Sequence, residues 1–223
     1  MKRLLPLAIL PVLCMGWMSC SHSGKEHSSL PDPRTLDKSV PEYKNPFHPS
    51  TYAHFVARKD YKKTYDIYKD DTLLKRTPKK SRKIFVCLND QRGQYLVDGL
   101  VAMDFPLSSG VKAYPTKTGD YTVISKKEDH ISNLYGKMYD AEGKCINYNA
   151  ESTDPVPEGG RFDGSPMPYW QRLTNAGLGL HVSVRLPRNV AQILYTQTSI
   201  GTPVTIQNTP LPVPEAQKTP MVQ

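Results

Sequence analysis

The sequence predicts a mainly β fold, because short strands follow one another at close spacing and only one internal helix is indicated. Ile84, Val86 and Leu88 alternate with less apolar residues, and Asp98-Gly99 is a hairpin signal shortly afterwards. Further strands are expected at residues 94–97, 100–107, 120–125, 178–186 and 203–206, and a helix at 188–195. This arrangement is typical of a β-sandwich or barrel.

The chain has 223 residues, which leaves room for one domain of ordinary size. A mean hydropathy of −0.51 and 20 prolines indicate a loop-rich body. After the first twenty residues we expect no membrane-spanning helix, because no apolar run there is long enough.

The N-terminus indicates export to the cell envelope. Lys2 and Arg3 precede a short apolar run, and Met18-Ser19-Cys20 follows it, so residues 1–19 are predicted to be a signal peptide. Cys20 resembles the cysteine of a bacterial lipobox, although Trp17 departs from the usual leucine. Lipid on Cys20 would anchor the chain to the membrane, facing the periplasm. The alternative is an ordinary cleavage site with Cys20 incidental.

Charge narrows the expected partners. The formal net charge of +8 falls to +6 once Lys2 and Arg3 are removed with the signal. A basic exported protein suits an anionic envelope polymer or a lipid surface. Because of export, we do not expect nucleic acid as a partner.

The remaining chain divides into four parts by composition. Residues 20–50 are polar and predict a flexible tether, in which His22, His27 and His48 are solvated and bind no metal. Residues 51–83 predict a helical, basic extension, with Tyr61, Tyr65 and Tyr68 on one helix face. Residues 84–206 form the domain, in which Cys87 and Cys145 are expected to be free thiols. Residues 207–223 contain four prolines and predict a disordered tail.

Seven segments of the domain carry a family resemblance. In chain order they are IFVCLNDQRGQYLVDG (84–99), LSSG (107–110), PTKTGDYTV (115–123), MPYW (167–170), GLGLH (177–181), VRLPRNVAQILY (184–195) and GTPVTI (201–206). Together they resemble the catalytic domain of the L,D-transpeptidases, the YkuD-like family. The resemblance implies a β-sandwich or barrel with a short helix after the active-site strand and a lid insertion at residues 126–166.

The resemblance also implies a reaction. In the family, a cysteine attacks a carbonyl of a peptidoglycan tetrapeptide stem, and the acyl group then passes to an amine. No metal or organic cofactor is implied. The implied partner is the peptidoglycan stem peptide, for which Tyr135, Arg161 and Tyr169 are candidate contacts.

The sequence departs from the family where the nucleophile should stand. The family has a histidine, a loop of roughly a dozen residues, and then Ser-His-Gly-Cys-x-Arg at the end of that loop. Here His181-Val182-Ser183-Val184-Arg185 run on directly. In one alignment His181 is the base histidine and the loop is deleted. In the other, Ser183 occupies the nucleophile position. The GLGL run before His181 favours the first.

Neither alignment predicts an effective enzyme. If this stretch is extended, His181 and Ser183 lie about 6.6 Å apart on the same side of the strand. That distance exceeds the hydrogen-bond reach of a base, and a serine hydroxyl is almost never ionised without one. Arg185 is the third catalytic candidate and could still contact a carboxylate or a backbone carbonyl. A structural role is the alternative for Arg185 and for His181. We therefore predict little or no transpeptidation. Three readings remain: acylation on Ser183, wall binding without turnover, or a damaged domain.

Overall fold

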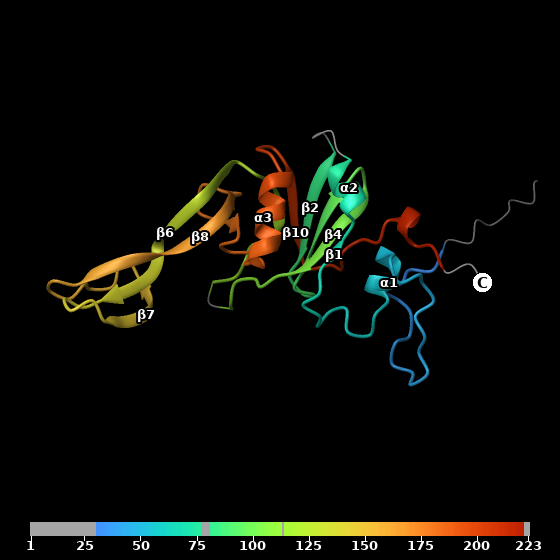
Figure 1. Ribbon diagram of the computed structural model, residues 1–223, viewed down its shortest axis with the longest axis horizontal. Helices are drawn as coiled ribbons and strands as arrows, with labels where there is room; N and C mark the ends of the chain where they lie inside the picture. Colours follow the sequence, from blue (N-terminus) through green and yellow to red (C-terminus); the bar gives the residue numbers. More distant parts are fainter. Residues whose placement is uncertain (1–29, 77–80, 113, 221–223) are drawn as a thin grey trace, which may run out of the picture.

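The computed structural model describes residues 30–76, 81–112 and 114–220. Its strands and helices confirm the mainly β fold (Figure 1). The strands are β1 (Tyr68–Lys69), β2 (Arg82–Cys87), β3 (Arg92–Val97), β4 (Leu100–Pro106), β5 (Gly119–Thr122), β6 (Ser125–Tyr139), β7 (Cys145–Glu151), β8 (Arg161–Arg172), β9 (Gly179–Leu180) and β10 (Pro203–Gln207). The helices are α1 (Tyr52–Val56), α2 (Asp71–Lys75) and α3 (Arg188–Gln197), followed by a 3-10 turn at Glu215–Gln217. The predicted signal peptide and Cys20 lie outside the described residues.

The first sheet has six strands in the order β1-β4-β3-β2-β10-β5. β10 runs parallel to β2, and the other neighbours are antiparallel. Asp98 and Gly99 both have positive φ, 50° and 78°, which is the geometry of a type I′ hairpin turn between β3 and β4. The predicted hairpin is therefore confirmed.

The main core lies between this sheet and α3. Apolar side chains of β2, β10 and α3, among them Ile84, Val204 and Leu194, are at most 1% exposed. Leu180 and Val184 belong to the same core. The stretch around His181 is thus attached directly to the centre of the domain.

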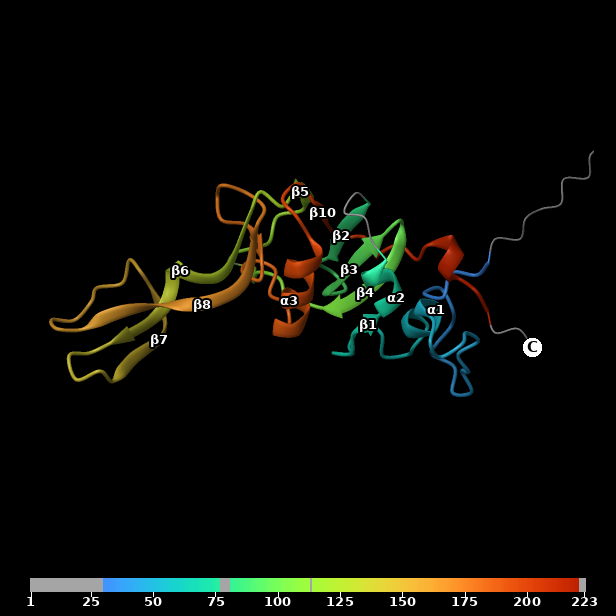
Figure 2. The same ribbon diagram turned by 45° about the horizontal axis from the view of Figure 1, so that its top comes forward.

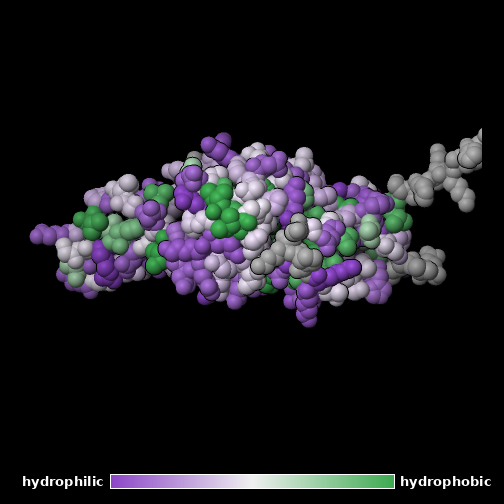
Figure 3. Space-filling model, turned by 90° about the horizontal axis from the view of Figure 1, so that it is seen from above, coloured by the Kyte–Doolittle hydropathy of each residue, from purple (hydrophilic) through white to green (hydrophobic). Residues whose placement is uncertain are grey.

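The second sheet, in the order β7-β6-β8-β9, forms an arm. β6 and β8 make a long twisted ribbon that carries β7 at its far end and projects away from the first sheet (Figures 1 and 2). Figure 3 shows separate apolar patches among polar surface on this arm, consistent with Ile131 and Ile146 being 60% and 50% exposed. The expected insertion at 126–166 builds most of the arm, but here it projects outward and does not fold back over the first sheet.

The other face of the first sheet is covered by the described segments that precede and follow the domain, which corrects two sequence expectations. The tether is packed from residue 30 onward, with Phe47 fully buried against Ala53 and Ala57. The proline-rich tail is also ordered to residue 220, and Leu211 and Val213 are only 2% and 7% exposed. The tail packs because its apolar side chains cover the sheet and because its carbonyls find side-chain donors.

The predicted long helix is wrong as well. Tyr61 is buried, Tyr65 is 88% exposed, and Tyr68 lies in β1, so the three rings share no helix face. The physical reason is Arg92, whose guanidinium donates to the backbone carbonyls of Thr64 and Asp66 at 2.8 and 3.1 Å. These long-range bonds take the place of local helical ones.

Among the described residues, no helix combines the length and apolar character that a membrane crossing requires.

Candidate functional site

The segment around His181 is a tight turn that follows β9. The backbone N–H of His181 donates to the carbonyl of Val184 at 2.7 Å, and that of Val184 donates to Gly179 at 3.2 Å. His181 has φ of 67°, a left-handed conformation that is rare and costly for residues other than glycine. The extended strand expected here is therefore replaced by a turn, and the spacing calculated for a strand does not apply.

The loop between β4 and β5 of the first sheet is attached to this turn at two points. Ser108 and Arg185 exchange backbone hydrogen bonds of 3.0 and 2.8 Å. The hydroxyl of Thr116 donates to the carbonyl of Ser183 at 2.9 Å and accepts from the N–H of Gly110 at 2.9 Å. The neighbouring LSSG and PTKTG segments thus meet the distant GLGLH segment at one place. We call this place, residues 107–116 with 179–185, the turn site.

Gln91 fixes this loop. Its side-chain amide donates to the hydroxyl of Ser109 at 2.8 Å and accepts from the Ser109 N–H at 2.8 Å. It also donates to the carbonyl of Leu88. Gln91 has φ of 49°, so the turn between β2 and β3 points its side chain at the LSSG segment. Sequence reasoning noted Gln91 only as a family landmark, and it missed Thr116, because both act on partners many residues away.

His181 is half-buried, and its Nδ1 atom has no hydrogen-bond partner among the residues that the structure describes. Burial lowers the pKa of His181 from its ordinary value of 6.5; a backbone hydrogen bond with Leu186 opposes this effect, and the nearby charge of Arg188 adds to it. The imidazole is therefore neutral at pH 7. A neutral imidazole can accept a proton, but no hydrogen bond joins it to the hydroxyl of Ser183 within the described chain.

A tryptophan supports the turn from one side. Trp170 stacks on His130 with ring centroids 4.0 Å apart and an interplanar angle of 15°. A Cβ atom at Gly179 would lie 2.5 Å from the indole nitrogen, so only glycine leaves room for this ring beside β9. The MPYW segment is thus packed against the turn site, as the order of the motifs implies.

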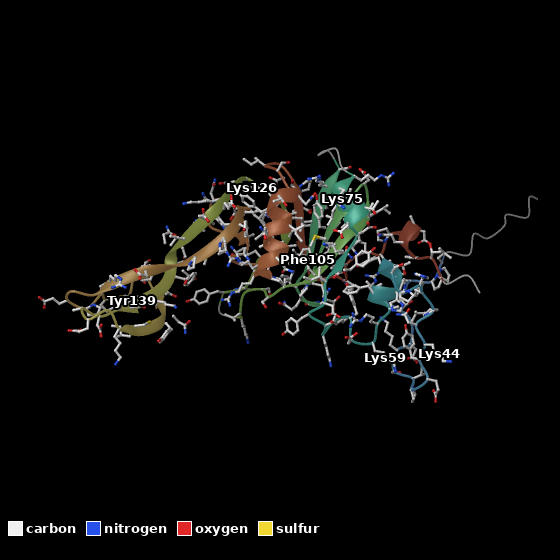
Figure 4. All side chains as sticks on the ribbon, viewed as in Figure 1. Lys44, Lys59, Lys75, Phe105, Lys126 and Tyr139 are labelled. Atoms are coloured by element: carbon white, nitrogen blue, oxygen red, sulfur yellow. The ribbon has the colours of Figure 1, made fainter. Side chains whose placement is uncertain are left out.

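The three predicted stem-peptide contacts are not brought together. Tyr135 lies on the arm opposite Glu151 of β7. Arg161 lies farther along the arm, where it pairs with Asp163 at 3.3 Å and stacks over the ring of Tyr139, which Figure 4 labels. Tyr169 is partly buried against the main core beside Tyr195. Their separation follows from the outward direction of the arm.

Both cysteines of the described chain are free and lie elsewhere. Cys87 is buried at the end of β2, with its sulfur 3.3 Å from the N–H of Asp90 and 3.7 Å from the carbonyl of Asn208. Burial raises the pKa of the Cys87 thiol, which makes it less reactive. Cys145 begins β7 on the arm, opposite Tyr139. Neither thiol contacts the turn site.

The side chains that remain available at the turn site are few. Arg185 is exposed, and it forms no ion pair with a carboxylate of the residues that the structure describes. Val111 and Tyr114, in the loop between Gly110 and Thr116, are 68% and 67% exposed. Lys112 is likewise exposed and forms no ion pair within the described chain. The site therefore presents two cations, Arg185 and Lys112, beside two exposed apolar side chains, a combination suited to a short peptide that ends in a carboxylate.

A model of the L,D-transpeptidase catalytic domain family, YkuD, matches residues 81–206. The chain belongs to the L,D-transpeptidase family. The match covers more than half of the 223 residues.

Solved structures similar to the chain are also L,D-transpeptidases. They include L,D-transpeptidase 1 from Mycobacterium tuberculosis, at 15% identity over 56% of this chain and 60% of that chain, with a TM-score of 0.41. An L,D-transpeptidase from Mycobacterium smegmatis has 18% identity over 57% and 58%, with a TM-score of 0.43. One from Enterococcus faecium has 25% identity over 57% and 50%, with a TM-score of 0.41. The chain thus spans about six tenths or less of these proteins. No curated protein matches it.

Proposed function

We propose that this L,D-transpeptidase-family protein binds peptidoglycan stem peptides at the cell envelope and does not transpeptidate them through a cysteine. The turn at residues 179–184 carries this proposal. It closes directly from β9 to Arg185, so that no residue bearing a thiol stands between His181 and Arg185.

The chemistry of the family requires a nucleophile, a base within hydrogen-bond reach of it, and N–H donors for the oxyanion. At the turn site the neutral imidazole of His181 supplies a base without a nucleophile. The backbone of Ser183 is held by Thr116, and its hydroxyl has no base to ionise it. Binding of a stem peptide requires neither a nucleophile nor a base. The guanidinium of Arg185 can bind its carboxylate, and the exposed side chains of Val111 and Tyr114 can contact its apolar parts.

The first prediction concerns turnover and binding. Incubation of the purified chain with tetrapeptide-stem muropeptides is expected to release no D-alanine and to leave the intact mass unchanged. The chain is still expected to sediment with insoluble peptidoglycan. Arg185→Gln should weaken that sedimentation about tenfold, since a charge-assisted hydrogen bond contributes roughly 1.5–3 kcal/mol.

Arg161→Gln is the matched control, because it removes the same charge from the arm. It is expected to bind peptidoglycan like the parent chain. A stronger effect of Arg161→Gln than of Arg185→Gln would move the binding surface to the arm. A covalent peptidyl adduct on the chain would refute the proposed loss of transpeptidation, and mass spectrometry of its peptides would identify the nucleophile.

We also propose that lipid on Cys20 holds the protein at the membrane. The short apolar run and the Met18-Ser19-Cys20 sequence support this proposal. Cys20→Ser is expected to shift the chain from the membrane fraction to the aqueous fraction of a bacterial host, and equal partitioning of the two forms would contradict lipidation.

A further inference from the structure

A cavity lies far from the turn site and is lined mainly by the segment that precedes the domain. Its volume is about 370 Å³. Figure 4 labels Lys59, one of its lining residues, at the end of the molecule opposite the arm. Five of the lining side chains are cations, Arg34, Lys38, Arg58, Lys59 and Lys62, whereas the only carboxylate in the lining is Asp90.

The two arginines are neutralised by neighbouring acids. Arg34 pairs with Asp32 at 2.5 Å, and Arg58 pairs with Asp60 and Asp66 at 2.8 and 2.7 Å. These three acids stand outside the lining of the cavity, so the arginines contribute shape and partial charge to it.

The three lysines are less fully compensated. The ammonium of Lys38 donates to the carbonyl of Val56 at 2.6 Å, and that of Lys59 donates to the carbonyl of Val40 at 2.9 Å. Within the described chain, neither ammonium forms an ion pair. Lys62 pairs with Asp90 at 2.7 Å, and its side chain is 66% exposed. Within the lining, cations outnumber carboxylates, and the closest partners of Lys38 and Lys59 are backbone dipoles. The charges of Asp32 and Asp37 act on these two ammoniums without forming an ion pair.

The neighbours of Lys38 show the same imbalance. Burial lowers the pKa of Lys38, the positive charges of Lys62 and Arg34 add to this effect, and Asp32 opposes it. Like charges facing one cavity repel each other, and an anion placed between them relieves that repulsion.

We propose that this cavity binds the phosphate group of an anionic ligand. Lysine ammoniums are point charges with several donors each, and lysine is a common phosphate ligand in proteins. A phosphate with up to two charges and several acceptor oxygens can meet the ammoniums of Lys38 and Lys59 together, whereas a carboxylate offers two oxygens and one charge. A volume of about 370 Å³ also leaves room for a small organic group attached to the phosphate.

Two sources supply this chemistry, free phosphate compounds and the headgroup of an anionic phospholipid. Leu30, the first described residue, donates its N–H to Glu215 at 3.2 Å, and Arg34 and Lys38 of the cavity follow within eight residues. Ten residues separate Cys20 from Leu30, so the chain between them reaches at most roughly 35 Å. A lipid on Cys20 would thus keep the cavity close to a membrane surface, but phosphate binding itself does not depend on that anchor.

The test is calorimetric titration of the full chain, purified without lipid as Cys20→Ser, with inorganic phosphate, glycerol 3-phosphate and acetate. We expect saturable 1:1 binding of the two phosphates and at least about tenfold weaker binding of acetate. Lys38→Gln combined with Lys59→Gln should weaken phosphate binding about tenfold or more, because two charge-assisted contacts are lost. Lys44→Gln combined with Lys75→Gln removes the same charge from residues outside the cavity and should leave binding unchanged (Figure 4).

Thermal unfolding without ligand shows whether the variants remain folded. If Lys38→Gln does not fold, Lys59→Gln alone is used in its place, together with Lys38→Arg, which keeps the charge and should retain binding. The proposal is overturned if neither phosphate gives a heat of binding. It is also overturned if the Lys44/Lys75 control variant loses as much phosphate binding as the Lys38/Lys59 variant, or if acetate binds as tightly as phosphate.

Vesicle sedimentation then separates the two sources. If the cavity takes a lipid headgroup, the Cys20→Ser chain sediments with phosphatidylglycerol vesicles, much less with phosphatidylcholine vesicles, and loses this preference in the Lys38/Lys59 double variant. If it takes free phosphate compounds, the double variant loses phosphate binding and sediments as before. If the double variant loses neither phosphate binding nor the vesicle preference, the proposed site is refuted.

Discussion

Asp104→Asn is expected to lower the free energy of unfolding by about 3–5 kcal/mol, because it leaves a buried guanidinium without its counter-charge. Arg92 and Asp104 are both 0% exposed. The Nε and Nη2 atoms of Arg92 donate to one oxygen of Asp104 at 2.8 and 2.6 Å. The other oxygen accepts from the hydroxyls of Tyr52 and Tyr61 at 2.7 and 2.8 Å.

Four hydrogen bonds oppose the effect of burial on this carboxylate. Burial raises the pKa of Asp104, and the Arg92 charge and the phenol donors oppose that effect. An asparagine side chain has about the same shape, but it brings no charge and replaces one acceptor oxygen by a donor. The phenols of Tyr52 and Tyr61 would then face an amide that accepts fewer bonds.

The same network joins parts of the chain that are distant in sequence. Asp104 lies on β4 and Arg92 on β3, whereas Tyr52 and Tyr61 belong to the preceding segment. Gln94 donates to the hydroxyl of Tyr52 at 2.5 Å and to the carbonyl of Pro212 at 2.9 Å, which brings in the tail. Loss of Asp104 should therefore loosen both chain ends as well as the sheet.

Urea denaturation followed by circular dichroism measures this effect. Asp60→Asn is the control, because it removes a carboxylate from an exposed pair with Arg58 and should change stability by less than about 1 kcal/mol. Arg92→Met combined with Asp104→Leu should recover much of the loss, since an apolar pair of similar volume leaves no buried charge. A change within about 1 kcal/mol for Asp104→Asn alone would show that the pair is not the main link.

Sequence reasoning succeeded where local pattern decides the structure. The alternation of Ile84, Val86 and Leu88 predicted β2, and Asp98-Gly99 predicted the hairpin, because neighbouring residues are enough to specify each. The helix expected at 188–195 is α3, at Arg188–Gln197. These elements position the turn site, so its place in the fold was predictable.

Prediction from the sequence failed where partners far away in the chain determine the local structure. The tyrosine spacing at 61, 65 and 68 suits a helix. However, Asp104 accepts a hydrogen bond from Tyr61, and Arg92 donates to the carbonyls of Thr64 and Asp66. The same holds at the turn site. A strand period does not reveal that His181 adopts positive φ or that Thr116 binds the carbonyl of Ser183. The local pattern was misleading there, because residues 181–184 close in a turn that backbone hydrogen bonds hold.

Ending the chain after Asn208 is expected to destabilise the fold by about 4–8 kcal/mol, although the removed residues were predicted to be disordered. Leu211 and Val213 each contribute roughly 1.5–3 kcal/mol through burial. The truncation also removes the Pro212 carbonyl from Gln94, and an unsatisfied buried amide costs roughly 1–3 kcal/mol. The truncation also removes Gln217. Its side-chain amide accepts from the N–H of Val101 at 2.7 Å and donates to the carbonyl of Val101 at 3.1 Å.

Point variants separate packing from chain length. Leu211→Ala alone should cost about 2–4 kcal/mol, the usual range for a buried leucine. Glu215→Gln, which alters an exposed pair with Lys218 in the same tail, should cost less than about 1 kcal/mol. If the truncated chain unfolds at the same urea concentration as the full chain, the tail does not contribute to stability. In that case the surface of Tyr52, Leu96 and Val101 that Val213 now covers would be exposed to water. Only a rearrangement of this apolar cluster could offset the free-energy cost of that exposure.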